Sequence, residues 1–296
     1  MKTVQFRRFG GPEVLELVDL PDPHAGSGQV RIEVRAAGVN ASDWKKRQGL
    51  MDEELPQTLG YEAAGVVDEV GDGVTGVAVG DRVFGFSDDG IAQAELAVLT
   101  HFAPIPPSLG FAEAAALPAA LETATRALDQ LGATGTLLVN GASGSVGGAA
   151  VQLAVARGVR VIGTASPANH DYVRALGAEP VAYGDGLVDR VRAVGAVDCA
   201  LDVAGSGVLA ELIELTGSAD RVVTIADFVG AQQYGVRFSR GDSGRALHVL
   251  DEIGELVESG GFEVPAVQTF ALSDVAEAHR FGERGGVRAK IVLVAD

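Results

Sequence analysis

The second half of the chain alternates short apolar runs with longer segments of helical periodicity. Apolar runs predict strands at residues 136–140, 159–164, 180–183, 197–202 and 221–226, with a last short one at 235–239. Apolar side chains that recur every three or four positions predict helices at residues 146–157, 168–176, 186–193, 206–216 and 243–259. Strands and helices that alternate in this way form a parallel sheet with helices on both faces. We therefore expect an α/β, doubly wound nucleotide-binding domain.

The first 118 residues follow a different pattern, in which short β-rich runs are separated by Gly, Pro and Asp. Alternating or β-rich runs predict strands at residues 29–36, 63–70, 81–85 and 95–99. This spacing is typical of a barrel-like all-β unit. From Phe111 the pattern becomes that of an alanine-rich helix, which Pro118 interrupts. The chain closes with an apolar strand at residues 290–294.

Composition narrows the class of protein. Of the 296 residues, 47% are hydrophobic and 21% are charged, as in a folded globular protein. A net charge of −17 disfavours binding to nucleic acid or to an anionic membrane, so an anionic cofactor needs a locally positive pocket. Cys199 is the single cysteine, which excludes disulfides and fits a reducing compartment. With no 18-residue apolar run and no apolar segment after the first residues, we expect a cytoplasmic protein.

A glycine-rich turn between the strand at 136–140 and the helix after it suggests a ligand. The turn reads as a dinucleotide fingerprint with Ala142 in place of the usual first glycine. Gly144 lets the backbone approach a pyrophosphate, and Gly147 lets the helix pack on its strand. Free N–H groups at the helix start then bind the anion. The candidate contacts are Gly141, Ala142, Ser143, Gly144, Ser145, Val146 and Gly147; the alternative is an ordinary strand–helix turn.

The end of the second strand bears on which cofactor is bound. An NAD enzyme usually has Asp or Glu there to hold the ribose hydroxyls. Residues 163–167 contain no acid, Thr164 lies among them, and Ser166 can hydrogen-bond a 2′-phosphate. His170 and Arg174 follow on the next helix and can supply positive charge, or simply form a solvated face. The pattern favours NADPH over NADH.

The fourth and fifth strands end in two further candidate segments. Because ligands of parallel sheets bind at the carboxyl ends of the strands, the backbones there should flank the nicotinamide. The residues concerned are Val203, Ala204, Ile225 and Ala226.

Several motifs, spread nearly end to end, carry a family resemblance. They are Ala-Gly-Val-Asn-Ala-Ser-Asp-Trp-Lys at 37–45, Leu-Gly-Tyr-Glu-Ala-Ala-Gly-Val at 59–66, Val-Gly-Asp-Arg-Val-Phe at 79–84, the glycine turn, and Leu-Gly-Ala at 176–178. With them the chain resembles the medium-chain dehydrogenase/reductase superfamily. The resemblance implies a GroES-like β-barrel catalytic domain at residues 1–120 and 260–296, and a Rossmann domain at 121–259. The mid-chain glycine turn argues against a short-chain dehydrogenase, as does the absence of a Tyr followed four residues later by Lys.

Two positions set the chain apart from the zinc enzymes of that superfamily. In those enzymes a cysteine stands at the Asn40 position and a histidine at the Tyr61 position. Asn and Tyr are not normal zinc ligands, one cysteine cannot form a four-cysteine lobe, and the five histidines show no paired ligand spacing. We therefore expect no metal. The pattern resembles the zinc-independent quinone oxidoreductase branch, whose members reduce quinones and enones with NADPH.

The resemblance also suggests roles for four residues of the first domain. Asn40 would offer its amide near the nicotinamide or the substrate carbonyl, although an asparagine in a turn is the alternative. Ser42 matches a hydroxyl that relays protons, or starts a helix. Lys45 stands where relatives place a tyrosine and would donate a proton or hydrogen bond, or is simply solvated. Tyr61 would line the former metal cavity or pack as an ordinary aromatic.

Three further positions are assigned by the resemblance alone. Thr123 would contact the nicotinamide side, Tyr183 the adenosine end, and Arg288 the cofactor phosphate. Each has an ordinary structural alternative: a helix threonine, the last residue of a strand, and a surface arginine. The resemblance also implies a homodimer, formed by pairing of edge strands near residues 235–239.

Three functions follow from these expectations. The first is NADPH-dependent reduction of a quinone or α,β-unsaturated carbonyl as a small-molecule substrate. The second is the same chemistry on an enoyl thioester. The third is an NADPH-binding protein without turnover, acting as a sensor or structural protein.

Overall fold

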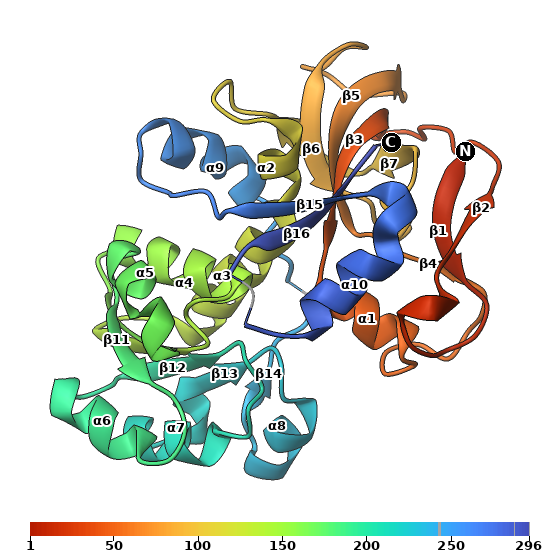
Figure 1. Ribbon diagram of the computed structural model, residues 1–296. Coiled ribbons are helices and arrows are strands. Elements are labelled where there is room, and N and C mark those ends of the chain that lie inside the picture. Colours follow the sequence, from red (N-terminus) through yellow and green to blue (C-terminus); the bar gives the residue numbers. More distant parts are fainter. Residues whose placement is uncertain (242–243, 287, 296) are drawn as a thin grey trace. The chain divides into compact units, whose positions relative to one another are not determined.

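The computed structural model describes residues 1–241, 244–286 and 288–295. The chain forms two compact units of α/β structure (Figure 1). Unit 1 comprises Met1–Ala119, Leu250–Gly254 and Val264–Asp296. Unit 2 comprises Ala120–Val249 and Glu255–Glu263.

Unit 1 is built mainly of β-strands. Its larger sheet has the order β15-β16-β3-β5-β6-β8, with β7 also paired to β3. These strands are β3 (Val30–Val39), β5 (Glu62–Val70), β6 (Arg82–Phe86), β7 (Leu96–Leu99), β8 (His101–Pro104), β15 (Val267–Ala271) and β16 (Lys290–Val294). The smaller sheet, in the order β2-β1-β4, consists of β1 (Lys2–Phe6), β2 (Glu16–Asp19) and β4 (Gln57–Thr58). The helical segments are η1 (Pro12–Val14), α1 (Ala41–Arg47), α2 (Phe111–Ala115), η4 (Leu272–Asp274) and α10 (Val275–Glu283).

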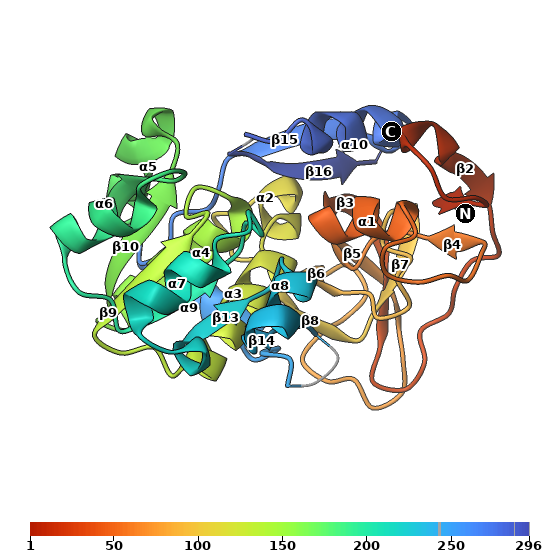
Figure 2. The ribbon, with the colours of Figure 1, turned by 90° about the horizontal axis from the view of Figure 1, so that it is seen from below.

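The central strand β3 of this unit pairs with a strand from the C-terminal segment, β16. The alternating residues Val30, Ile32 and Val34 are buried, as their periodicity predicts. From Ala36 onward β3 is buried at successive positions, because it is enclosed by β5 and by β16 on its two edges. The C-terminal elements β15, α10 and β16 lie together (blue in Figure 2). The antiparallel register of β16 on β3 places Ile291 opposite Val39, so the start of β16 meets the end of β3.

Helix α1 is fixed by a buried cation. Arg47 is fully buried; it donates to the Gly10 carbonyl (3.1 Å), to Glu283 Oε1 (2.7 Å) and to His279 Nδ1 (3.1 Å). Burial, and then the charge of Arg47, lower the pKa of His279 to about 3, so this imidazole is neutral. The neutral ring can accept the hydrogen bond from Arg47, which holds α1 against α10.

Unit 2 is a parallel sheet with the order β11-β10-β9-β12-β13-β14. Its strands are β9 (Thr136–Asn140), β10 (Arg160–Ala165), β11 (Glu179–Ala182), β12 (Cys199–Asp202), β13 (Val222–Thr224) and β14 (Arg237–Phe238). The helices are α3 (Pro118–Leu131), which begins in the last residues of unit 1, α4 (Ser145–Ala156), η2 (Pro167–Asn169), α5 (His170–Ala175), α6 (Leu187–Val194), α7 (Leu209–Thr216), η3 (Ala219–Arg221), α8 (Phe228–Tyr234) and α9 (Val249–Glu258), which lies partly in unit 1. Helices α6, α7 and α8 cover one face of this sheet, and α4 and α5 the other (Figure 1).

The order of the strands marks where a ligand should bind. From β9 the chain builds outward to β10 and β11, then returns to the other side of β9 with β12, β13 and β14. The direction of the connections reverses at β9, and such a switch point opens a crevice at the carboxyl ends of the strands. The glycine turn at residues 141–147 lies at that end of β9.

Several predicted boundaries are wrong, for reasons tied to Pro and Gly. The expected helix at 168–176 is split into η2 and α5, since Pro167 starts a 3₁₀ turn. The interruption predicted at Pro118 is confirmed: α2 ends at Ala115, and Pro118 begins α3, where the N–H that proline lacks would have no partner in any case. The strand expected at 235–239 shortens to β14, as Gly235 caps α8 with a φ of +69°. The helix expected from 243 begins at Val249, and residues 242 and 243 lie outside the described residues.

Candidate active site

The glycine turn of unit 2 fits a dinucleotide pyrophosphate. Gly141 has a φ of +91°, which favours glycine. A Cβ added to Gly147 would lie 2.1 Å from the Gly141 carbonyl oxygen, so α4 packs directly on the turn and admits no side chain there. A Cβ on Gly144 would meet only that same oxygen, at 3.6 Å, which leaves the backbone at the start of α4 open. The first N–H groups of this 12-residue helix are therefore accessible to an anion.

Beneath the turn, a buried polar ladder crosses four neighbouring strands. Asn140, Thr164, Asp202 and Thr224 stand at or beside the carboxyl ends of β9, β10, β12 and β13 and face one another in register. Thr164 Oγ1 donates to Asn140 Oδ1 (2.7 Å), and Asn140 Nδ2 donates to Asp202 Oδ1 (2.9 Å). Thr224 Oγ1 donates to Asp202 Oδ2 (2.7 Å). All four are at most 1% exposed, so their polar atoms need hydrogen-bond partners within the protein, and the neighbouring strands supply them.

The ladder holds the loops that follow these strands. The Gly141 N–H donates to Thr164 Oγ1 (2.9 Å), and the N–H groups of Ala204 and Gly205 donate to Asp202 Oδ1 (3.1 and 3.0 Å). The N–H groups of Ala226 and Asp227 donate to Thr224 Oγ1, both at 3.1 Å. Because the Thr164 side chain is fully buried, it cannot contact a cofactor itself. Its role is to hold the backbone of the glycine turn.

The predicted residues after β12 lie at the glycine turn, and Ala226, after β13, lies beside the loop that follows β12. A Cβ on Gly141 would lie 3.1 Å from Val203 Cγ2 and 3.0 Å from Ala204 Cβ. Ala226 is equally close to Gly205, 2.9 Å from a Cβ placed there. Ile225 is half-buried and hydrogen-bonds through its N–H to the Asp202 carbonyl (3.0 Å). These segments form one surface at the carboxyl edge of the sheet.

The predicted 2′-phosphate residues lie just beyond β10. Ser166 is half-buried and precedes η2, where Asn169 Nδ2 donates to Ser143 Oγ of the glycine turn (3.4 Å). His170 lies with Nε2 3.3 Å from the Ala165 carbonyl oxygen. Arg174 is paired with Asp171 (2.5 Å), and both side chains are exposed. The charge that Arg174 was predicted to supply is therefore shared with Asp171.

Thr123, Tyr183 and Arg288 are less closely tied to these groups. Thr123 lies on α3, half-buried, with its hydroxyl 3.4 Å from Glu122 Oε2. Tyr183 follows β11 and is 59% exposed. Arg288 belongs to unit 1 and is exposed, two residues before Lys290.

In unit 1, Asn40 joins an ion pair that sequence reasoning missed. Lys290 Nζ donates to Glu62 Oε1 (2.7 Å) and to Asn40 Oδ1, and Asn40 Nδ2 donates to Glu62 Oε1 (2.8 Å). The Ala119 N–H donates to the other oxygen, Glu62 Oε2 (2.7 Å). The side chains of Lys290 and Glu62 are 3% and 0% exposed. Glu62 stands in the motif at 59–66, and Lys290 is the first residue of the predicted strand at 290–294. Each is a charged residue at the start of an apolar strand, and that position was the available signal.

A second buried acid lies beside this group. Asp43 accepts the Asn40 N–H through Oδ2 (2.7 Å) and also Gln93 Nε2 (3.3 Å). Burial raises the pKa of Asp43 to about 6, against the hydrogen bond from Asn40 and the charge of Lys290, which lower it. Asp43 is thus a buried carboxyl that titrates just below neutral pH.

Tyr61, one of the predicted proton donors, is contacted by Lys46 and not by the predicted Lys45 beside it. Lys46 Nζ lies 5.6 Å from the Tyr61 ring centroid and donates to the Thr58 carbonyl (3.1 Å). Burial lowers the pKa of Lys46 and raises that of Tyr61, so the ammonium is acidified and the phenol stays protonated. Lys45 and Ser42 are half-buried on the same helix. Lys46 lies three residues after the inward-facing Asp43, so helical spacing could have predicted that both lie on the same face of α1.

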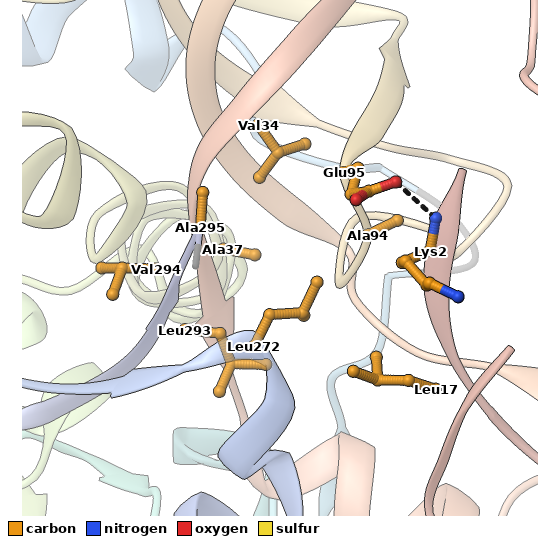
Figure 3. Close-up of a pocket in the computed structure, with 10 residues that line it drawn as sticks. All are labelled: Lys2, Leu17, Val34, Ala37, Ala94, Glu95, Leu272, Leu293, Val294 and Ala295. Atoms are coloured by element: carbon orange, nitrogen blue, oxygen red, sulfur yellow. Dashed lines mark hydrogen bonds between the residues drawn. The ribbon is translucent and has the colours of Figure 1, made fainter. Parts of the chain in front are cut away.

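A separate cavity of about 330 Å³ lies elsewhere in unit 1 (Figure 3). Its lining is mainly aliphatic, from residues such as Leu17, Leu272 and Leu293. The Lys2 N–H and Glu95 Oε2 are hydrogen-bonded to each other at its side (2.6 Å). The cavity offers no cluster of reactive groups comparable to that around Asn40.

Two further findings concern metals and membranes. Within the described residues, no group of three or more His, Cys, Asp or Glu side chains is arranged to hold a metal ion. In that same part of the chain, no helix combines the length and apolar character needed to cross a membrane.

Comparison with known proteins places the chain in a family. Residues 26–122 match the alcohol dehydrogenase GroES-like domain, and residues 176–293 match the zinc-binding dehydrogenase family. The quinone oxidoreductase of Coxiella burnetii is 32% identical, with a TM-score of 0.87 over 100% of this chain and 99% of that one. The chain belongs to the medium-chain dehydrogenase/reductase superfamily, in its quinone oxidoreductase-like branch.

Two further proteins match nearly all of the chain. The Escherichia coli quinone oxidoreductase complexed with NADPH is 25% identical, with a TM-score of 0.83 over 99% of this chain and 100% of that one. The spectinabilin polyketide synthase system protein NorB of Streptomyces orinoci is 35% identical over 96% of this chain. The chain spans only 14% of the length of that protein.

Proposed function

We propose that this superfamily member is a zinc-independent, NADPH-dependent reductase of quinones or α,β-unsaturated carbonyls. The observation that carries the proposal is the environment of Asn40. At the position where zinc relatives have a cysteine ligand, this chain has an amide held between an ammonium and a carboxylate. Glu62, the carboxylate there, is already paired with Lys290. A divalent metal would have to compete with that cation, so the donor set does not suit zinc.

The cofactor's place follows from unit 2. The open N-terminus of α4 would hold the pyrophosphate, and Ser166 with the adjoining turn would meet the 2′-phosphate. Val203, Ala204, Ile225 and Ala226 would flank the nicotinamide at the sheet edge. When bound, NADPH supplies a hydride and its two electrons.

The residues of unit 1 would assist the acceptor. The second Nδ2 hydrogen of Asn40 would donate to the acceptor's carbonyl oxygen, where negative charge develops. Conjugation in a quinone or enone spreads that charge, so a neutral donor is sufficient. Tyr61, with Lys46 over its ring, and Ser42 or Lys45 on α1 are the candidate sources of the proton that completes the product.

The relatives support the choice of cofactor and acceptor. The Escherichia coli quinone oxidoreductase binds NADPH on the same fold, and the Coxiella burnetii protein shares this name. The strand end after β10 in this chain carries no acid that would repel a 2′-phosphate. Both observations favour NADPH over NADH.

A second candidate is reduction of an enoyl thioester. The match to a polyketide synthase protein over 96% of this chain favours it. An enoyl thioester is also an activated alkene, so the same residues would serve, and the difference lies in the size of the substrate.

The decisive experiment is an acceptor panel followed at 340 nm with NADPH. We would compare 9,10-phenanthrenequinone, a small cyclic enone and a crotonyl thioester, each with NADPH and with NADH after treatment with EDTA. The proposal predicts saturable oxidation of NADPH by the quinone or the enone, undiminished by EDTA. A marked preference for the thioester would select the second candidate. Saturable NADPH binding without oxidation across the panel would instead indicate a non-catalytic binding protein.

A further inference from the structure

Three strand ends of unit 1 bring an amide between two opposite charges. Asn40 follows β3, Lys290 begins β16 and Glu62 begins β5. Lys290 donates to the oxygen of the Asn40 amide, and the nitrogen of that amide donates to Glu62. The ion pair closes the triangle at 2.7 Å.

This arrangement permits one orientation of the amide. An ammonium only donates hydrogen bonds, and an ionised carboxylate only accepts them. A flipped Asn40 would place its N–H groups against Lys290 and its oxygen against Glu62, and both contacts would be repulsive. The two ends of an asparagine amide look alike in shape, so charge is what distinguishes them here.

The carboxylate itself has little room to move. Its second oxygen accepts the Ala119 N–H, and a Cβ on Gly38 would lie 2.1 Å from its first oxygen. Gly38 is therefore required where Glu62 crosses β3. The triangle is built into the backbone of three strands.

We propose that Lys290 and Glu62 are positioning residues that keep the N–H side of the Asn40 amide toward the acceptor. One N–H is used on Glu62, and across residues 1–241, 244–286 and 288–295 the structure gives the second no acceptor. That N–H is the donor for the acceptor's carbonyl oxygen. A flipped amide would present an oxygen there and disfavour the developing charge. This inference rests on the proposed function.

The test removes both charges at once. The Lys290→Met/Glu62→Gln variant removes both members of the ion pair, so it should stay folded, whereas a single variant would leave one buried charge of the pair without its partner. The charges of Lys290 and Glu62 act on Asp43 in opposite directions, so the double variant removes both effects together. We expect a melting temperature close to that of the wild type, a Kd for NADPH changed less than twofold, and a kcat for the acceptor at least tenfold lower. Asn40→Ala should show a similar loss, and the triple variant no further loss, because the residues act as one unit.

A matched control removes an ion pair that does not touch Asn40. Lys2 and Asp19 form an exposed lysine–carboxylate pair in the same unit, at 2.7 Å. Lys2→Met/Asp19→Asn should keep kcat and KM within twofold of the wild type. A purely structural role for Lys290 and Glu62 would leave the kcat of their folded double variant at the wild-type value, which would overturn the proposal.

A readout without substrate separates this inference from the proposed function. In ¹H–¹⁵N spectra, the side-chain amide of Asn40 is identified by its loss in Asn40→Ala. The wild type should show two well-separated amide proton shifts, which converge in the double variant and not in the control. Unchanged amide shifts in the double variant would contradict the inference even if the enzyme is active. If the wild type reduces no acceptor, the proposed function fails, while these shifts still decide whether the charges orient the amide.

Discussion

At the scale of single residues, the protein combines groups that the sequence identified with partners it did not reveal. Asn40 and Tyr61 stood out because they replace metal ligands in a recognisable motif. Their contacts with Lys290 and Lys46 depend on strand register and helix facing, which local patterns do not specify. A lysine 250 residues away in the chain can be assigned to Asn40 only when the pairing of β16 with β3 is known.

Asp43 should make stability depend on pH. Its pKa is about 6 in the folded protein against 3.8 for an ordinary aspartate, so the folded state binds more protons than the unfolded state between these values. This contribution to the free energy of unfolding is fully present below pH 4 and is lost as the pH rises through 6. We expect wild type to lose at most about 3 kcal/mol relative to Asp43→Asn across that window. Urea titrations at pH 4.5 and 7 would measure the difference, and a pH-independent difference would contradict the assignment.

Ser166 should control the choice between the two nicotinamide cofactors. A carboxylate at this position would repel a 2′-phosphate and could instead accept hydrogen bonds from a ribose hydroxyl. We expect Ser166→Asp to lower kcat/KM with NADPH at least tenfold and to leave NADH equal or better. The comparison needs both cofactors at a fixed acceptor concentration, with Ser166→Ala to separate the loss of the hydroxyl from the effect of the added charge. An unchanged ratio in the Asp variant would place the 2′-phosphate elsewhere.

At the scale of elements, periodicity predicted the strands and helices of unit 2 well and their ends less well. Buried parallel strands are apolar on both faces, so they appear in the sequence as short continuous apolar runs. The ends depend on Pro and Gly, as at Pro167 and Gly235. The polar residues at the strand ends did not enter the prediction of where the strands stop. Asn140, Asp202 and Thr224 mark where the strands stop and what joins them.

The polar ladder predicts a sharp difference between two substitutions of Thr224. Valine keeps the shape and removes the hydroxyl, which leaves Asp202 Oδ2 and two backbone N–H groups without that partner. We expect Thr224→Val to lower the free energy of unfolding by about 1–3 kcal/mol and to weaken NADPH binding. Thr224→Ser keeps the hydroxyl and serves as the control in urea denaturation and calorimetric titration. Equal stability and affinity of the two variants would show that the ladder does not hold the loops.

At the scale of the whole molecule, the sequence predicted two kinds of domain because the chain changes from β-rich to alternating α/β. The return of the last segment to the first domain came from the family resemblance, since a strand pattern at 290–294 does not specify its neighbour. The pairing of β16 with β3 now supplies the physical reason, because it covers the edge of a central strand and brings Lys290 to Asn40.

We further propose that the protein is a homodimer that uses the free edge at β14. In the described part of the chain, β14 ends the sheet order of unit 2, and α8 beside it exposes Phe228, Val229 and Tyr234. Unpaired strand edges and apolar patches both favour association. Val229 is 73% exposed, so a glutamate at this position should leave the fold of a monomer intact. In the proposed interface the same glutamate should oppose association. We expect Val229→Glu to weaken dimerisation at least tenfold in sedimentation equilibrium, and Val79→Glu, at a valine of unit 1 that is 66% exposed, to have no effect. A monomeric wild type at 50 µM would refute the dimer.

The activity that we propose for this chain is metal-independent reduction with NADPH, assisted by an oriented amide. Its most direct test is to follow a deuterium label from the nicotinamide C4 of NADPH into the product of an enone, with EDTA-treated enzyme. We expect one deuterium at the β-carbon of the product, at a rate lowered at least tenfold in Asn40→Ala. Product without the label, or turnover that EDTA abolishes and zinc restores, would contradict it.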